Sequence, residues 1–173
     1  MHFREIETAD IPALFSVRTR TRENRYTLDE LERLGITEKS VAEKLSASYK
    51  GWLCTQNGAV AGFCIADRAT GELWVVAVLP EFEGNGVGGR LMSFAEEWLW
   101  STGCTRAWLT TDTDVSLRAY GFYRRRGWLD WKVEDGVRWM ELFAPNVQPE
   151  RSPRAVGAVS LNRGSETSEK HRE

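Results

Sequence analysis

The fold of this chain is decided by Glu83-Gly84-Asn85-Gly86-Val87-Gly88-Gly89-Arg90-Leu91, a stretch that contains four glycines. It separates an apolar, strand-like run at residues 73–79 from a helix-like run at residues 91–100. Glycine has no Cβ, so the backbone of such a loop can come close to a ligand. Its N–H groups also lie at the positive end of the next helix, where anions bind. The stretch therefore predicts a site for a phosphorylated ligand.

The segments on both sides of the loop predict a strand and a helix. Residues 73–79 are apolar throughout, which is typical of a central strand covered on both faces. Pro80 ends the pairing of that strand. Apolar residues recur after the loop at helical spacing, and they are Val87, Leu91, Phe94, Ala95 and Trp98. The centre of the chain is thus a strand–loop–helix crossover.

Shorter patterns surround this crossover. Residues 3–7 predict a first strand, and capping residues at Thr27 and Thr37 mark helices. Asn57-Gly58 predicts a tight turn between strands at 52–55 and 60–66. After the crossover come a strand (105–111), a helix (117–126) and a hairpin (128–133 and 137–143).

The predicted order is β-α-α-β-β-β-α-β-α-β-β, an α+β (mixed α/β) domain. We expect a central, mostly antiparallel, twisted sheet of six to seven strands flanked by about four helices. This domain covers residues 1–144. Residues 145–173 are rich in Ser, Arg, Glu, Asn, Gly and Pro, which predicts a disordered tail.

Composition narrows the partners of the protein. The 173 residues are enough for one domain with a core, and the formal net charge is −2. A net charge of this sign does not indicate the basic surface that binds nucleic acid. No apolar run is long enough to span a bilayer, and the N-terminus has no signal core. We therefore expect a cytoplasmic protein with neither nucleic-acid nor membrane partners, and the exposed terminal strands leave a homodimer open.

The histidines and cysteines exclude several chemistries. The only histidines are His2 and His171, near the two ends, so we expect no Ser-His-Asp or Cys-His catalysis and no metal site. Cys54 and Cys64 fall on the two arms of the Asn57-Gly58 hairpin. A two-residue turn would place their thiols on opposite faces of the sheet, so we expect no disulfide between them.

The glycine loop also fits other descriptions. Gly84, Gly86 and Gly89 match the dinucleotide pattern G-x-G-x-x-G. However, residues 80–83 separate the loop from its strand, and the acidic ribose ligand expected roughly 20 residues later is missing. No Lys-Ser/Thr pair follows the glycines, which excludes a phosphate-binding loop of the Walker type. The remaining alternative is that the four glycines form a flexible turn that binds no ligand.

Two motifs in order resemble the GNAT family of acyl-CoA-dependent N-acetyltransferases. The first is Arg/Gln-x-x-Gly-x-Gly/Ala after a strand that ends in a Val-x-Pro-like step, here Val78 to Leu91. The second is Asn-x-x-Ala-x-x-Leu-Tyr-x-x-x-Gly-Phe, here Ser116 to Trp128. The resemblance covers residues 1–143. Glu83 replaces the Arg or Gln of the first motif, and we expect its carboxylate to turn to solvent. Ser116 replaces the Asn of the second motif.

The resemblance implies acetyl-CoA as cosubstrate, held in a V-shaped gap between the strand ending at Val78 and the strand ending near Thr111. The pantetheine amides would pair with the backbone of residues 76–78. The diphosphate would lie on the amides of residues 84–89, with Arg90 or one of the arginines 124–126 at the outer phosphate. The implied cofactor-binding residues are Val76, Ala77, Val78, Glu83, Gly84, Asn85, Gly86, Val87, Gly88, Gly89, Arg90, Ser116, Ala119 and Tyr123.

The resemblance also implies transfer of an acetyl group to a primary amine of a small molecule or peptide. Tyr123 matches the tyrosine of the family and is the predicted general acid, since a hydroxyl with a pKa near ~10 can protonate a thiolate with a pKa near ~8.5. Asp112 is the first candidate for the base, ahead of Asp114 and Glu72. The acceptor site would be lined by residues 22, 23 and 26, and Trp74 or Trp108 would suit an aromatic acceptor.

Two alternatives stay open at this point. A non-catalytic acyl-CoA-binding or sensor module would hold the cosubstrate without turnover, and Tyr123 is the feature that favours an enzyme. A dinucleotide-binding domain is the less favoured alternative, and it would bind NAD rather than coenzyme A.

Overall fold

The computed structural model describes residues 1–23 and 25–147. Within these residues the chain forms seven strands and five α-helices in the order β1 (His2–Glu5), α1 (Ile11–Arg18), α2 (Leu28–Arg33), α3 (Glu38–Ser46), β2 (Tyr49–Gln56), β3 (Ala59–Asp67), β4 (Glu72–Val78), α4 (Val87–Ser101), β5 (Arg106–Asp112), α5 (Arg118–Arg125), β6 (Leu129–Glu134) and β7 (Val137–Phe143). The mixed α/β class is confirmed, with three helices rather than two between β1 and β2. The predicted tail, apart from residues 145–147, lies outside the described residues.

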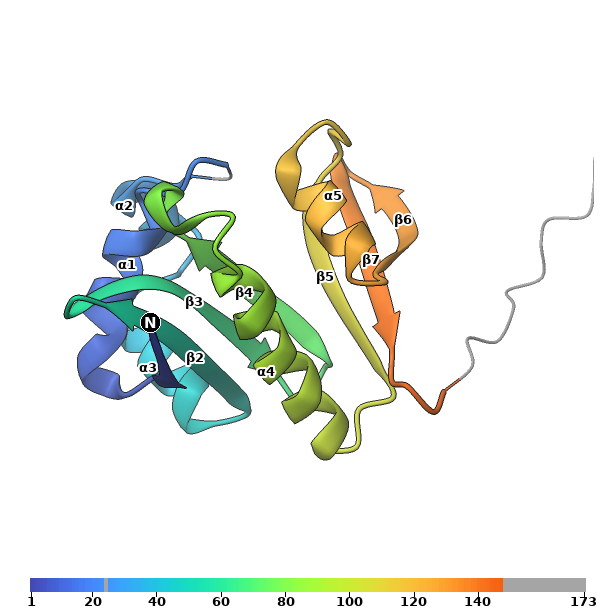
Figure 1. Ribbon diagram of the computed structural model, residues 1–173, viewed down its shortest axis with the longest axis horizontal. Coiled ribbons are helices and arrows are strands. Elements are labelled where there is room, and N and C mark those ends of the chain that lie inside the picture. The colour runs from blue at the N-terminus through green and yellow to red at the C-terminus, as the bar shows by residue number, and fades with distance from the viewer. Residues whose placement is uncertain (24, 148–173) are drawn as a thin grey trace, which may run out of the picture.

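All seven strands form one sheet in the order β1-β2-β3-β4-β5-β7-β6. Neighbouring strands are antiparallel except β4 and β5, which are parallel. Helix α4 lies on one face of the sheet and α1 to α3 on the other, while α5 accompanies the β5–β7–β6 part (Figure 1). The described residues contain no helix that is both long and apolar enough to cross a lipid bilayer.

Local sequence signals define the ends of several elements. Thr27 and Glu30 form a capping box at the start of α2, where the Glu30 N–H donates to Thr27 Oγ1 at 3.2 Å. Thr37 caps α3 in the same way. Asn57 and Gly58 have φ values of 53° and 78°, as the tight turn between β2 and β3 requires.

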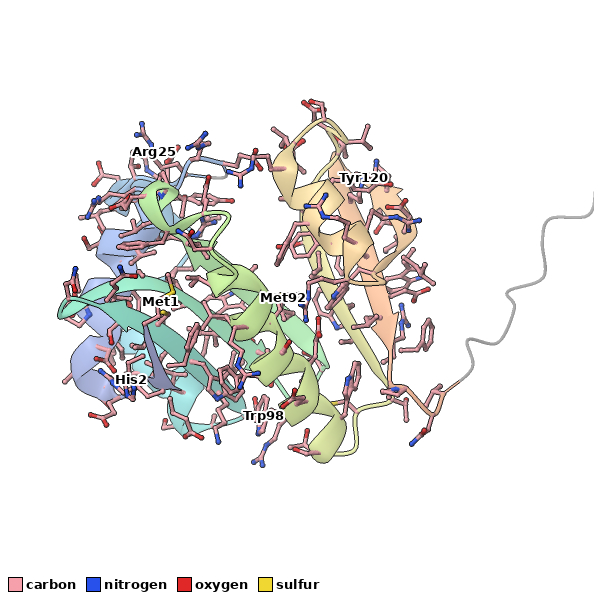
Figure 2. The ribbon with its side chains drawn as sticks, in the orientation of Figure 1. Met1, His2, Arg25, Met92, Trp98 and Tyr120 are labelled. Carbon is pink, nitrogen blue, oxygen red and sulfur yellow. The ribbon has the colours of Figure 1, made fainter. Side chains whose placement is uncertain are left out.

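The core consists of two apolar clusters, one on each face of the sheet. On one face, α4 buries side chains against β2 to β5, and Figure 2 shows Met92 and Trp98 along this helix. On the other face, α1 packs against β3 and α3 against β2, in a cluster that includes Leu14, Leu53 and Phe63. Strand β4 contributes side chains to both clusters, so the predicted central strand with two covered faces is confirmed.

The prediction about the hairpin thiols is wrong. A β-bulge follows the turn, so Cys54 lies opposite Gly62 and Cys64 lies opposite Trp52. A shift of one residue moves a side chain to the other face of a sheet. Both thiols therefore belong to the same cluster, under α4, and both are free, as we expected.

A polar contact joins α4 to the segment around α5. The Glu96 carboxylate accepts hydrogen bonds from the Arg126 guanidinium at 2.6 Å and from Trp128 Nε1 at 3.0 Å. Trp128 is fully buried. Since buried polar groups are costly without partners, this contact fixes the position of α5 relative to α4.

Candidate active site

The sheet opens between its two parallel strands. Within the described residues, β4 and β5 pair at one position, Glu72 with Trp108. A β-bulge makes Trp74 an extra residue in β4, since Ile65 pairs with Val75 and Ala66 with Leu73. Bulges bend a strand and disturb its pairing. From the paired position onward the two strands diverge, as Figure 1 shows.

This divergence forms a cavity of about 670 Å³, which we call the β4–β5 cleft. Residues 73–78 of β4 and 109–111 of β5 form its two sides. The glycine loop, α5 with the residues just before it, and the end of α1 with residues 21–23 also line it. The V-shaped gap expected from the family resemblance therefore lies where it was predicted, between the ends of β4 and β5.

The backbone of β4 presents hydrogen-bonding groups to this cleft. The Leu79 N–H, just after β4, donates to the Ala61 carbonyl of β3 at 2.9 Å. Backbone groups alternate in direction along an antiparallel strand, so Ala77 also turns to β3, where it lies opposite Phe63. Val76 and Val78 consequently turn their amides and carbonyls toward the open edge. Of the three residues predicted to pair with pantetheine, these two have the required direction.

The glycine loop presents donors to the same cleft. None of the amide N–H groups from Gly84 to Gly89 donates a hydrogen bond to another protein atom within the described residues. The first bond of α4 runs from the Arg90 N–H to the Gly86 carbonyl at 3.0 Å. Gly84 and Gly86 have φ values of 77° and 79°, a conformation that strains any residue with a Cβ. The loop is thus a set of donors at a helix N-terminus, which suits an anion.

Glu83 does not turn to solvent, so that expectation is wrong. Its side chain is only 19% exposed and forms ion pairs with Arg118 and, at 3.3 Å, with Arg22. Arg118 is the first residue of α5, and Arg22 follows α1. Glu83 therefore joins the glycine loop to α5 across the mouth of the cleft.

A second carboxylate lies next to this ion pair. The Glu23 oxygens accept the N–H groups of Arg118 and Ala119 at 3.1 and 3.2 Å. A carboxylate at a helix N-terminus is favourable. Arg22 and Glu23, predicted to line the acceptor site, line the β4–β5 cleft instead.

The basic residues proposed for the outer phosphate have different positions. Arg90 is exposed and lies over the Phe94 ring at 4.7 Å, outside the lining of the cleft. Asn85 is also outside this lining. Arg126 is paired with Glu96, while Arg125 lines the cleft.

Tyr123 lines the β4–β5 cleft from α5, together with Ser116 and Ala119. Tyr123 is 8% exposed. Burial raises the pKa of Tyr123 well above its ordinary value, so the hydroxyl keeps its proton at neutral pH. It is therefore available as a donor.

A second cavity, of about 430 Å³, lies between α1, α2 and the sheet, and we call it the α1–α2 cavity. Glu72 and Asp112 both line it, whereas Asp114 does not. It also contains Tyr26, while Trp108 packs on Trp139 away from both cavities. The residues that line both the cleft and the cavity are Arg18, Trp74, Val75, Thr110 and Thr111. The two spaces meet at these residues.

The two carboxylates of the α1–α2 cavity differ in environment. Glu72 is half-buried, and this burial raises its pKa, with the nearby Asp67 carboxylate acting in the same direction. Asp112 is exposed, and its Oδ1 accepts the Asp114 N–H at 2.8 Å. Glu72 is thus the carboxylate more easily protonated by a bound amine.

Arg18 lines the candidate site but was not among the residues predicted from the sequence. It lies on α1 at the junction of the two cavities, with its guanidinium over the Tyr26 ring at 4.6 Å. Burial lowers its pKa. A signal was present, because Arg18 follows Ile11 and Leu14 at spacings of seven and four and so lies on their apolar helix face.

Comparison with known proteins identifies the family. The model of the acetyltransferase (GNAT) family matches residues 11–128, which is more than half of the chain. This chain belongs to the GNAT acetyltransferase family.

Curated relatives match parts of the chain. It is 29% identical over 108 residues to the [ribosomal protein bS18]-alanine N-acetyltransferase of Escherichia coli, which is 60% of this chain and 65% of that protein. It is 36% identical over 66 residues to the mycothiol acetyltransferase of Pseudarthrobacter chlorophenolicus, 38% of this chain and 20% of that protein. The chain therefore spans less than two thirds of either relative.

Solved structures share the fold over most of the chain. The PaiA N-acetyltransferase from Thermoplasma acidophilum, in complex with coenzyme A, aligns with a TM-score of 0.71 at 16% identity, covering 83% of this chain and 100% of that one. The E. coli ribosomal-protein-S18-alanine N-acetyltransferase aligns with a TM-score of 0.64 at 22% identity, covering 85% and 98%. At these identities the likeness shows the fold alone.

Proposed function

We propose that this chain is an N-acetyltransferase that transfers the acetyl group of acetyl-CoA to a primary amine by direct attack. The observation that carries the proposal is the row of amides from Gly84 to Gly89, which have no protein acceptor within the described residues. Except for Asn85, the residues of this row line a cleft that meets a second cavity at Trp74 and Thr110. Family membership and the names of the curated relatives support the same reaction class.

The residues present fit coenzyme A. Backbone donors at the N-terminus of α4 suit a diphosphate, and the open edge at Val76 and Val78 suits the amides of a pantetheine arm. Arg125 lines the cleft and is our candidate for the contact with the outer phosphate. When bound, acetyl-CoA supplies a thioester whose carbonyl carbon can accept an amine.

The reaction then requires one bond to form and one to break. The amine nitrogen bonds to the carbonyl carbon, the carbon–sulfur bond breaks, and its electron pair leaves on sulfur. Tyr123 donates its proton to that sulfur and regains one from solvent. A backbone N–H at the open edge of β4, such as that of Val76, holds the carbonyl oxygen as its charge grows.

The amine must lose its proton as it is acylated. Asp112 and Glu72 both line the α1–α2 cavity, from which the amine would approach. The half-buried position of Glu72 favours it as the acceptor of this proton, directly or through water, although the sequence analysis placed Asp112 first. Cytoplasmic residence and a homodimer stay predictions.

Calorimetry with coenzyme A, acetyl-CoA and NAD, followed by thiol release from acetyl-CoA with an amine library, tests the proposal. We expect binding of both CoA ligands, no binding of NAD, and thiol release that depends on the amine. A protein that binds neither CoA ligand would contradict the proposal. Binding without thiol release for any amine would favour the non-catalytic alternative.

A further inference from the structure

The α1–α2 cavity has aromatic walls contributed by separate segments. Phe15 comes from α1, Tyr26 from the connection between α1 and α2, and Trp74 from β4. Phe63 of β3 adds a fourth ring. Aromatic side chains that line a pocket favour a ligand with an apolar, flat group, because ring contacts add to the energy of burial.

Two of these rings are held in place by contacts inside the protein. Tyr49 meets Trp74 edge-on, with 5.7 Å between ring centroids and an interplanar angle of 80°. The Lys44 ammonium also lies 5.4 Å from the Trp74 ring. Arg18 covers the Tyr26 ring at 4.6 Å. Side chains that are already ordered lose little freedom when a ligand binds, so these walls are suited to recognition.

The charges of the cavity favour a cation. Glu72 and Asp112 place two carboxylates in its lining, which also holds the Arg18 guanidinium over Tyr26. The Lys44 ammonium lies outside this lining, against the Tyr49 and Trp74 rings and near Glu72. Glu72 is half-buried, so its attraction for an ammonium group is screened less than that of a surface carboxylate. Glu72, Asp112 and the residues shared with the β4–β5 cleft all line this cavity. An ammonium group bound to one of these carboxylates would therefore lie near the proposed site of acetyl transfer.

The volume of the cavity limits the size of the ligand that it can hold. Its volume is about 430 Å³. An apolar protein cavity of about 150 Å³ holds benzene, so this cavity has room for a ring and a short amine chain. We propose that the acceptor is a small primary amine that carries an aromatic ring, bound in the α1–α2 cavity with its amine toward Glu72. This inference rests on the function proposed above.

A peptide with an N-terminal alanine fits the cavity less well. The name of the E. coli relative specifies alanine as the residue that it acetylates. An alanine side chain is a single methyl group, which would leave most of an aromatic-walled cavity unfilled. Apolar surface that stays in contact with water contributes nothing to binding.

Calorimetry on the protein saturated with coenzyme A tests the inference without requiring turnover. The probes are phenethylamine, n-butylamine and alanyl-glycyl-glycine. We expect phenethylamine to bind at least about tenfold more tightly than n-butylamine, since burial of a ring adds more than about 1.4 kcal/mol. We expect the alanyl peptide to bind more weakly than phenethylamine.

Two variants locate the binding site. Trp74→Leu and Phe15→Leu should each weaken phenethylamine binding about fivefold or more and leave n-butylamine binding within about twofold. Phe15 lines only the α1–α2 cavity, so this variant should not change the affinity for coenzyme A. The matched control is Trp131→Leu, because Trp131 is 45% exposed on β6 and lines neither cavity.

Three results would overturn the inference: equal binding of the two amines by the wild type, an equal effect of the variants on both amines, or tighter binding of the alanyl peptide. The last result would favour a peptide amine as the acceptor. Each of these leaves the proposed function intact, because that proposal fails on different results: no binding of coenzyme A and acetyl-CoA, or binding without thiol release for any amine.

Discussion

Glu72 and Trp108 form the one residue pair between β4 and β5 within the described part of the chain. The Trp108 N–H and its indole Nε1 both donate to the turn before β4, to Gly71 and Thr70, each at 3.0 Å. The strands are thus joined firmly at one end and separate toward the other. This geometry creates the β4–β5 cleft and exposes the backbone that the proposed cosubstrate needs.

Replacement of Gly86 should separate loop function from stability. Gly86→Ala should cost about 1 kcal/mol of unfolding free energy, because φ at this position is 79°. It should also weaken coenzyme A binding about tenfold, or about 1.4 kcal/mol, by moving the loop amides. Urea unfolding and calorimetry measure the two effects.

Gly58→Ala is the matched control, since Gly58 has a φ of 78° in the distant β2–β3 turn. A Cβ at either glycine would meet no atom within 4 Å. We expect a similar loss of stability with unchanged coenzyme A affinity. Equal coenzyme A affinity in both variants would argue against the loop as the diphosphate site.

Removal of the Tyr123 hydroxyl should affect turnover and not binding. Tyr123→Phe should lower kcat about 100-fold, the size typical of a lost general acid, and leave coenzyme A affinity within about twofold. Tyr120→Phe on the same helix is the control. The Tyr120 hydroxyl donates to Asp130 at 3.0 Å, and Tyr120 does not line the cleft. A wild-type rate for Tyr123→Phe would rule out the proposed acid.

The charge of Glu83 should oppose the phosphates of the cosubstrate. Glu83 neutralises Arg22 and Arg118, so Glu83→Gln should release both cations and tighten coenzyme A binding about two- to fivefold at low ionic strength. The gain should shrink as salt is added. Glu81→Gln, which breaks an exposed pair with Arg20, should have no such effect. Weaker binding by Glu83→Gln would instead mean that this carboxylate organises the loop.

The burial of Glu72 should give the protein a pH-dependent loss of stability. The pKa of Glu72 is raised in the folded state, so its contribution is most favourable below the unfolded value near 4.5 and is lost as the pH rises through the folded value. Glu72→Gln removes that loss. The unfolding free energy of the variant minus that of the wild type should therefore increase between pH 4 and pH 7.

Chemical denaturation at several pH values measures this difference. The matched control is Glu97→Gln, which removes an exposed carboxylate from α4. If the difference in unfolding free energy between Glu72→Gln and the wild type did not change with pH, burial would not destabilise the charged form of Glu72. The reason to favour Glu72 over Asp112 as the base would then be lost.

Local features of the fold were predictable because they depend on neighbouring residues. The Thr27 cap, the Asn57-Gly58 turn and the strand–loop–helix crossover each follow from side chains within a few positions. The bulge at Cys54 and Thr55 was not predictable, because the Asn57-Gly58 turn residues do not specify a shift of register in the strands that they join. It reversed the expected face of one thiol.

In the candidate site, too, some residues were predictable from local sequence and others depend on contacts made only in the folded protein. The glycine loop and Tyr123 could be located from motifs in the sequence. The partners of Glu83 could not, since Arg118 is 35 residues away and approaches only when α5 packs beside β5. Strand β7 also inserts between β5 and β6, an order that the hairpin pattern alone does not specify.

A crystal structure of the complex with coenzyme A tests the central claim most directly. The account predicts diphosphate oxygens within hydrogen-bond distance of the amides from Gly84 to Gly89, and a pantetheine arm along Val76 and Val78 between β4 and β5. Coenzyme A bound elsewhere, with those amides facing only solvent, would contradict it.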